Sequence, residues 1–260
     1  MNLTKKIAIV TGAAQGIGAG IAKRLANDGF TVVVLDLTEE ACFNTVDSII
    51  KNGGHAISIG ANVANENETK SAMEQIISKV GEPGVLVNNA GFARDVNMDL
   101  MDTKDWDDVI NVHLRGSFLM VKESLPYMKK SDWGRIVNIS SISAMGHSER
   151  ANYCAAKAGM HGFIKSLAVE LGPFGITANV VAPGLIVTAM TEATAKRNGL
   201  TLEKHLERAV KNIPVNRTGT PADIAHAVSF FVSEEASFVT GQVLSIWRSE
   251  ERRVGKECRS

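Results

Sequence analysis

Short runs of β-branched and other apolar residues alternate along this chain with longer segments in which apolar residues recur every three or four positions. The short runs predict strands and the longer segments predict helices. The predicted strands are Ile7–Thr11, Thr31–Asp36, His55–Gly60, Val85–Asn89, Arg135–Ser140, Thr177–Ala182 and Gln242–Ile246. The predicted helices are Ile17–Asn27, Glu39–Lys51, Glu66–Val80, Thr103–Lys130, Tyr153–Leu171 and Pro221–Val232, the last with Thr220 as its N-cap.

The alternation of strands and helices predicts parallel pairing, because a parallel connection needs a crossover segment that is usually a helix. The strands are almost continuously apolar, as expected when helices cover both faces of a sheet. No linker or internal repeat interrupts the pattern before the last dozen residues. We therefore expect one α/β domain over residues 1–247, a doubly wound (Rossmann) fold with a seven-stranded parallel sheet flanked by helices on both faces.

The chain changes character at Arg248, where a charged run follows an apolar strand without a turn signal. The segment 248–260 resembles the translation of a common sequencing adapter. We expect it to be non-native. The alternative is a genuine solvated, disordered tail, and neither interpretation gives it a function.

The composition excludes several classes of function. Lysine and arginine balance aspartate and glutamate at 28 each and are not clustered, so neither nucleic acid nor a membrane surface is an expected partner. The apolar runs are far shorter than the roughly 20 residues of a membrane span, and no secretory signal is recognisable, so we expect a cytoplasmic protein. The three cysteines and six histidines lack ligand spacing, so no metal site or disulfide is predicted.

A glycine-rich turn joins the first strand to the first helix, from Thr11 to Gly18. Glycines let the backbone turn sharply and approach a pyrophosphate, and the N–H groups that begin the helix face that charge. The turn therefore predicts a dinucleotide site that includes Gly12, Gln15, Gly16, Ile17 and Gly18.

Asp36 ends the second strand, eighteen residues after Gly18. An acidic residue at this place accepts hydrogen bonds from the hydroxyls of the adenosine ribose, whereas a 2′-phosphate would be repelled. The neighbouring Leu37 supplies no compensating positive charge. NAD(H) is therefore the expected cofactor and NADP(H) the alternative.

Tyr153 and Lys157 are four residues apart in a predicted helix, so they lie on one face, one turn apart. A nearby ammonium group favours the phenolate, so we expect it to lower the tyrosine pKa toward working pH, as general acid/base catalysis requires.

Taken together, these motifs resemble the classical short-chain dehydrogenase/reductase family, and most of all the bacterial 3-oxoacyl-(acyl-carrier-protein) reductase type. The resemblance runs from about Lys5 to Ile246. It rests on Thr11 to Gly18, Asn88-Asn89-Ala90-Gly91, Asn111-Val112, Ser140-Ser141, Tyr153 to Lys157, and Pro183-Gly184 with Thr188.

The resemblance implies a catalytic set. Tyr153 would donate a proton to the carbonyl oxygen and Ser141, rather than Ser140, would hydrogen-bond that oxygen. Lys157 would hold the nicotinamide ribose, and Asn111 would anchor a water. It also implies further cofactor contacts at Asn62, Val63, Asn89, Ala90, Gly91, Pro183, Gly184, Ile186 and Thr188.

The sequence departs from the family at Asn62, where aspartate is usual, and in the loop from Ser141 to Tyr153, which is one residue shorter than is common. Residues 189–212 stand where the family places a substrate lid; a surface helix pair that only covers the sheet edge is the alternative.

The expected function is NAD(P)-dependent interconversion of a ketone, such as a 3-oxoacyl thioester, and a secondary alcohol. An alcohol, polyol or hydroxysteroid dehydrogenase remains open, as does a non-catalytic dinucleotide-binding or assembly protein. The apolar faces of the helices Thr103–Lys130 and Tyr153–Leu171 suggest a homodimer or homotetramer, although internal packing would look the same.

Overall fold

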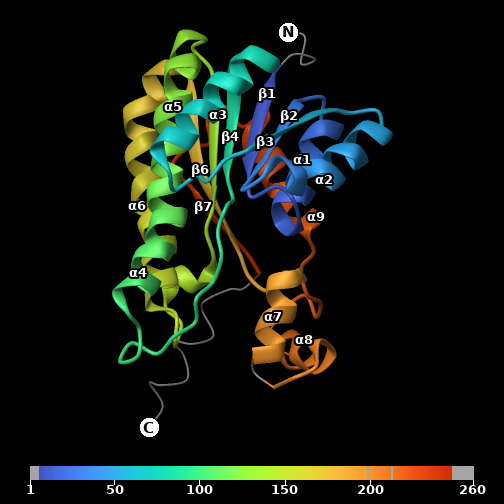
Figure 1. The fold of residues 1–260 in the computed structure, drawn as a ribbon, viewed down its shortest axis with the longest axis vertical. Helices are drawn as coiled ribbons and strands as arrows, with labels where there is room; N and C mark the ends of the chain where they lie inside the picture. The colour runs from blue at the N-terminus through green and yellow to red at the C-terminus, as the bar shows by residue number, and fades with distance from the viewer. Residues whose placement is uncertain (1–5, 198, 212, 248–260) are drawn as a thin grey trace.

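The computed structural model describes residues 6–197, 199–211 and 213–247. Its strands form one parallel sheet of seven strands in the order β3-β2-β1-β4-β5-β6-β7 (Figure 1). They are β1 (Ile7–Thr11), β2 (Thr31–Asp36), β3 (His55–Gly60), β4 (Pro83–Asn88), β5 (Gly134–Ile139), β6 (Ile176–Pro183) and β7 (Val243–Ile246). The doubly wound α/β fold is thereby confirmed, with strand bounds within two residues of those predicted. The tail predicted at 248–260 lies outside the described residues.

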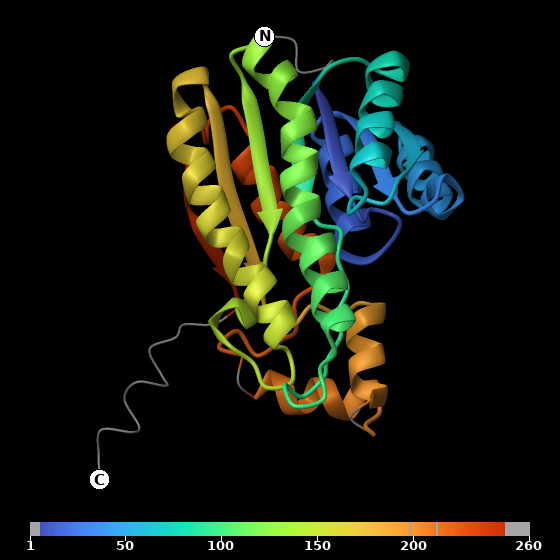
Figure 2. The same cartoon turned by 60° about the vertical axis from the view of Figure 1, so that its left-hand side comes forward.

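Helices cover both faces of the sheet (Figures 1 and 2). One layer consists of α1 (Gly16–Asn27), α2 (Glu39–Lys51) and α9 (Pro221–Val232), and the other of α3 (Glu66–Lys79), α5 (Gly116–Lys130) and α6 (Ala151–Leu171). Within β1, Val10 packs against the first layer and Ile9 against the second. Both faces of the strands are thus buried, which explains why no polar alternation is visible in them.

The predicted helix Thr103–Lys130 is interrupted in the structure. It comprises α4 (Thr103–Ile110), a π-helical turn η2 (Asn111–Arg115) and α5, with the Gly116 N–H bonded to the Asn111 carbonyl five residues earlier. Figure 2 shows these segments in green as one long rod beside α6. Such π-turns occur often at functional sites, and this one rotates the side chains that follow it.

Two shorter helices, α7 (Ala189–Arg197) and α8 (Leu202–Val210), lie beyond the carboxyl ends of the strands (Figure 1). Two 3₁₀ turns complete the elements, η3 (Ile142–Met145) and η4 (Gly172–Phe174). The lid predicted at 189–212 is therefore a helix pair by structure, and its role as a lid stays a prediction.

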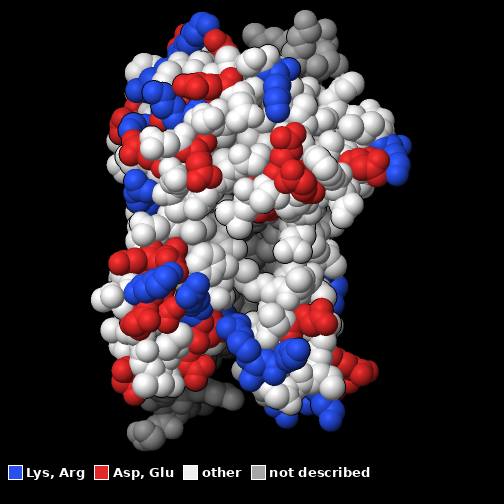
Figure 3. All heavy atoms as spheres, in the orientation of Figure 1, with Lys and Arg blue, Asp and Glu red and all other residues white. Residues whose placement is uncertain are grey.

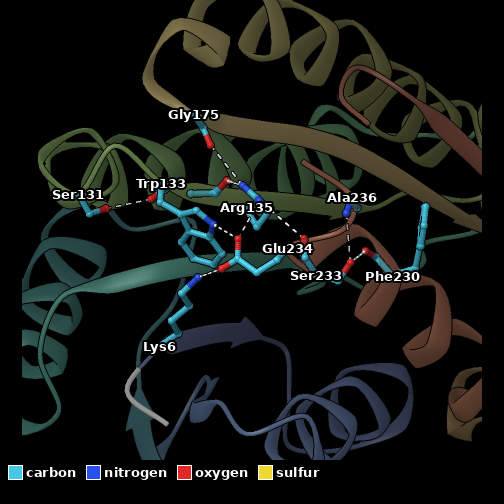
Figure 4. Close-up of polar contacts among 10 residues, drawn as sticks. Lys6, Ser131, Trp133, Arg135, Gly175, Phe230, Ser233, Glu234 and Ala236 are labelled. Atoms are coloured by element: carbon cyan, nitrogen blue, oxygen red, sulfur yellow. Dashed lines mark hydrogen bonds and ion pairs between the residues drawn. The ribbon is translucent and has the colours of Figure 1, made fainter. Parts of the chain in front are cut away.

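A charged cluster closes the opposite, amino-terminal edge of the sheet (Figure 4). Arg135 in β5 is 1% exposed, and its guanidinium donates to the carbonyls of Gly134 and Gly175 at 2.9 and 3.2 Å. Glu234 pairs with Lys6, accepts from the Trp133 indole at 3.2 Å and lies 3.9 Å from Arg135. The cluster joins the segment before β1, the start of β5 and the end of α9.

Candidate active site

A large cleft of about 1480 Å³ opens at the carboxyl ends of the strands. Strand order reverses at β1, which lies between β2 and β4, so the connections leave this edge in opposite directions. Doubly wound sheets bind ligands in the crevice formed at such a point. The cleft exceeds the ~300–1,000 Å³ of ordinary small-molecule pockets, as a dinucleotide with a substrate beside it requires. Figure 3 shows this face of the molecule hollowed near its centre.

The glycine-rich turn forms one wall of this cleft. Gly12 and Gly16 have φ values of 62° and 59°, which glycine adopts most readily, and a β-carbon on Gly12 would lie 2.7 Å from the Ala90 Cα. Among the described residues, no side chain caps the start of α1, so its first N–H groups remain available to an anion. These features fit the pyrophosphate of a dinucleotide.

Gly18 does not line the cleft. A β-carbon there would come within 2.2 Å of the Gly12 carbonyl oxygen and 2.5 Å of the Asn89 amide nitrogen. Its small size instead lets α1 pack closely against the turn, which Asn89 holds by donating to the carbonyls of Thr11 and Gly12, each at 2.9 Å.

The Asp36 carboxylate lies at the end of β2 and lines the cleft. It accepts hydrogen bonds from the backbone N–H of Ala14 at 3.0 Å and of Leu37 at 2.9 Å. These two bonds fix its orientation next to the glycine-rich turn, where a ribose hydroxyl could donate to it. Asn62 and Val63 lie nearby, and the Asn62 side-chain oxygen accepts from the Ala64 N–H at 3.0 Å.

Tyr153, Lys157 and Ser141 meet at the other end of the cleft. The Lys157 ammonium lies 5.5 Å from the centre of the Tyr153 ring and donates to the Ile139 carbonyl at 2.7 Å, at the end of β5. Ser141 follows that strand and lines the cleft with Tyr153, and its hydroxyl acts to lower the pKa of that phenol. Ser140 is turned elsewhere: its hydroxyl donates to the Lys157 carbonyl at 2.9 Å and lies 2.8 Å from His161 Nε2.

Burial governs the protonation of this group. Lys157 is 3% exposed, and desolvation lowers its pKa from 10.5 to about 7. Burial also raises the pKa of Tyr153, and the Ser141 hydroxyl opposes that rise. The expectation of a lowered tyrosine pKa is therefore wrong for the protein alone, because the loss of hydration outweighs the favourable contacts of the phenolate.

Asn111 is not brought to this site. It stands at the first position of the π-turn, and the cleft is lined instead by the next two residues, Val112 and His113. The catalytic role expected for Asn111 stays a prediction.

The other predicted site residues all line the one cleft. They are Gly12, Gln15, Gly16, Ile17, Asp36, Leu37, Asn62, Val63, Asn89, Ala90, Gly91, Ser141, Tyr153, Lys157, Pro183, Gly184, Ile186 and Thr188. They come from the carboxyl ends of six strands and from two helices, which explains why residues so distant in sequence converge.

Sequence reasoning missed several lining residues, among them His113, His161 and Trp247. The Trp247 indole packs on Gly184 so closely that a β-carbon on the glycine would lie 2.1 Å from the ring. No local sequence pattern predicts this contact, because it joins segments that are about sixty residues apart.

An ion-pair group lies at the mouth of the cleft. Asp95, in the loop after β4, pairs with Arg150 at 2.7 Å and with Arg197 of α7 at 3.0 Å. The loop, the start of α6 and α7 are thereby connected around the opening. Figure 3 shows basic side chains gathered over α7, below the hollow.

Two further properties bear on the kind of site. In the described part of the chain, no group of three or more histidine, cysteine, aspartate or glutamate residues could hold a metal ion. In the same residues, no helix has the length and apolar character needed to cross a bilayer.

Comparison with known proteins gives the family. The family model described as enoyl-(acyl carrier protein) reductase matches residues 12–246. The 3-oxoacyl-(acyl-carrier-protein) reductase FabG of Buchnera aphidicola is 40% identical over 248 residues, covering 95% of this chain and 97% of the relative. The short-chain reductase protein NovJ of Streptomyces niveus is 38% identical, covering 93% and 92%. The crystal structure of levodione reductase superimposes with a TM-score of 0.89 at 27% identity, covering 94% of this chain and 96% of that one.

These matches extend over nearly the whole chain and agree with the fold and with the grouping of Ser141, Tyr153 and Lys157. The protein belongs to the short-chain dehydrogenase/reductase family and is an oxidoreductase of the NAD(P)(H)-dependent kind.

Proposed function

We propose that the protein reduces the ketone of a 3-oxoacyl thioester, or a similar ketone, to a secondary alcohol, or catalyses the reverse reaction, with NADH as the preferred cofactor. The observation that carries this proposal is the meeting of Tyr153, Ser141 and Lys157 beside the dinucleotide cradle. The FabG relatives support the substrate class.

The residues of the site divide the work by their chemistry. A bound nicotinamide supplies the hydride. Tyr153, kept protonated by burial, donates its phenolic proton to the carbonyl oxygen, and Ser141 hydrogen-bonds the same oxygen. Lys157 is partly charged near neutral pH and has further N–H groups besides the one bonded to Ile139, so it can hold cofactor hydroxyls and stabilise the phenolate that forms.

Asp36 supports the preference for NADH. Two backbone N–H groups hold its carboxylate beside the glycine-rich turn, where it would repel a 2′-phosphate, and its neighbour Leu37 is an exposed apolar residue.

The second candidate is an alcohol, polyol or hydroxysteroid dehydrogenase. The structural similarity to levodione reductase favours this alternative. The experiment is a substrate panel in which NADH and NADPH consumption is followed with an acetoacetyl thioester, a cyclic ketone and a keto sugar. Faster turnover of the thioester with NADH supports the proposal. Turnover of only the cyclic ketone or the sugar would favour the second candidate.

We also infer that the protein forms a homodimer or homotetramer. On α5 and α6, the apolar residues Leu119, Val121, Ile164 and Leu167 are buried within the chain, whereas Phe118 of α5 is 48% exposed. Val169 of α6 is exposed as well. Light scattering on the purified protein tests this inference, and a monomeric mass would contradict it.

A further inference from the structure

The carboxylate of Asp95 joins the helix that carries Tyr153 to the predicted lid. Its Oδ2 atom lies 2.7 Å from the Arg150 guanidinium, at the start of α6, and 3.0 Å from the Arg197 guanidinium, at the end of α7. The Asp95 side chain is only 13% exposed, so water and salt screen its charge weakly. One partly buried acceptor is thus shared between two helices that border the cleft.

The pair with Arg150 fixes the first turn of α6. Arg150 is the N-cap of this helix, and its carbonyl accepts from the Cys154 N–H at 2.8 Å. A cation at a helix N-terminus is unfavourable, because the N-terminus itself carries a partial positive charge, and the Asp95 carboxylate offsets both charges. Tyr153 lies three residues after Arg150, so the ion pair holds the backbone from which the phenol projects.

Further hydrogen bonds hold the loop after β4 against the start of α6. The Val96 N–H donates to the Glu149 carbonyl at 2.7 Å. The fully buried Asn152 side chain donates to the Arg94 carbonyl at 3.3 Å and accepts from the Tyr153 N–H at 2.7 Å. The loop therefore carries its carboxylate in a fixed position relative to the phenol.

The pair with Arg197 connects α7 to this fixed loop. Met190 and Thr194 of α7 line the cleft, and the helix lies beyond the carboxyl ends of the strands (Figure 1). Arg197 ends the helix, and its guanidinium also donates to the Thr194 hydroxyl at 3.0 Å, which fixes the orientation of the side chain. Movement of α7 away from the cleft would have to break the ion pair with Asp95.

We propose that Asp95 is a positioning residue that holds α7 and the first turn of α6 in a fixed relation, so that Tyr153 and the lid enclose the substrate together. The inference rests on the proposed function, since Tyr153 is the group that is positioned. Arg150 fixes the helix of the phenol, and Arg197 keeps the cleft covered. The two contributions can be measured separately, because replacing one arginine leaves the other ion pair in place.

Hydrogen exchange followed by mass spectrometry tests both connections without a substrate. In Arg197→Met, we expect α7 to exchange about 2- to 5-fold faster than in the wild type, the effect of losing a partly exposed ion pair, with the start of α6 unchanged. In Arg150→Met, the start of α6 should exchange faster and α7 should not. In Asp95→Asn both segments should exchange faster, and adding Arg197→Met should change α7 no further.

Arg24→Met is the matched control, because it breaks an ion pair of comparable exposure with Asp28, and neither residue lines the cleft. Exchange in α6 and α7 of this variant should equal that of the wild type. Arg197→Lys keeps the positive charge, so its α7 should stay within about 2-fold of the wild type. Three results would overturn the proposal: unchanged exchange in α7 of Arg197→Met, faster exchange spread evenly over the chain, or Arg197→Lys as fast as Arg197→Met.

Steady-state kinetics give a readout that a loss of stability alone would not produce. With the ketone that the wild type reduces, Arg197→Met should raise KM about 3- to 10-fold with kcat little changed, because the lid holds the substrate less well. Asp95→Asn should also lower kcat per folded molecule, by about 10-fold, because the backbone that carries Tyr153 is less fixed. Wild-type kcat and KM in both variants would overturn the positioning role. If the exchange pattern holds but no ketone is reduced, the proposed function, and not this inference, has failed.

Discussion

The imidazole of His113 lies so close to the backbone of Gly91 that position 91 has no room for a side chain: a β-carbon there would be 2.5 Å from Nδ1 as well as 2.0 Å from Cε1. The two residues are in different elements, and their contact joins the end of β4 to the π-turn. Glycine at this position is therefore required by packing, in addition to its place on the cofactor wall.

Gly91→Ala should displace the His113 ring. We expect the free energy of unfolding to fall by about 1–3 kcal/mol, as is usual for overpacking, and the activity to fall with it. The matched control is Gly162→Ala in α6, where an added β-carbon would meet no atom within 4 Å and helix propensity should add about 0.5–1 kcal/mol. Urea unfolding of both variants provides the measurement. If Gly91→Ala and Gly162→Ala had the same free energy of unfolding, the structure around position 91 would accommodate the added β-carbon without loss of stability, and the prediction would be wrong.

Asp36→Asn should move cofactor preference from NADH toward NADPH. The loss of a charged acceptor is expected to weaken NADH binding by about 10- to 100-fold, the equivalent of one hydrogen bond to a charged group. For NADPH, the change also removes the repulsion between the carboxylate and the 2′-phosphate. Fluorescence titration with each cofactor measures the change. Asp47→Asn, on exposed helix α2, is the control. If the ratio of the two Kd values does not move, the Asp36 argument fails.

Lys157 should make the stability of the protein rise with pH. Its pKa is 10.5 when unfolded and about 7 in the buried site, so between these values the unfolded chain binds more protons. The free energy of unfolding therefore increases from pH 7 toward pH 10, by at most about 1.4 kcal/mol per pH unit from this group. Lys157→Met should remove that increase, and Lys165→Met, on the exposed side of α6, should not. Urea unfolding across this range shows whether the slopes differ; parallel slopes would contradict a neutralised buried lysine.

Arg135→Met should destabilise the protein without altering its chemistry. The change leaves the carbonyls of Gly134 and Gly175 without their donor, and we expect a loss of about 3 kcal/mol. Because Arg135 lies at the start of β5 and does not line the cleft, kcat per folded molecule should stay the same. Lys51→Met, which removes an exposed pair with Asp47, is the control and should cost less than about 1 kcal/mol. A fall in kcat would show that the cluster affects the site.

The sequence was sufficient for most of the fold because the strands are buried on both faces. Runs such as Thr31–Asp36 have no polar alternation, and helices of the expected lengths separate them, so the parallel sheet followed directly. The glycine-rich turn and Asp36 could be predicted from their places at the ends of the first two strands, whereas most other cleft residues were implied by the family resemblance.

The π-turn could not be predicted, since its apolar spacing differs from that of an α-helix by a single residue. The turn changes the direction of the side chains that follow it, and His113 in the turn lines the cleft. The contact between Trp247 and Gly184 could not be predicted either, nor could the ion pairs of Asp95 with Arg150 and Arg197. Both depend on tertiary packing between segments that are distant in the sequence.

The central claim is that Tyr153 is the proton donor in a site that binds a dinucleotide, and Tyr153→Phe tests it most directly. The ketone is whichever member of the panel the wild type reduces with NADH. We predict that Tyr153→Phe binds NADH with a Kd close to that of the wild type, while kcat for reduction falls by about 10²- to 10⁴-fold. A variant that reduces the same ketone at a rate within a few-fold of the wild type would contradict the account.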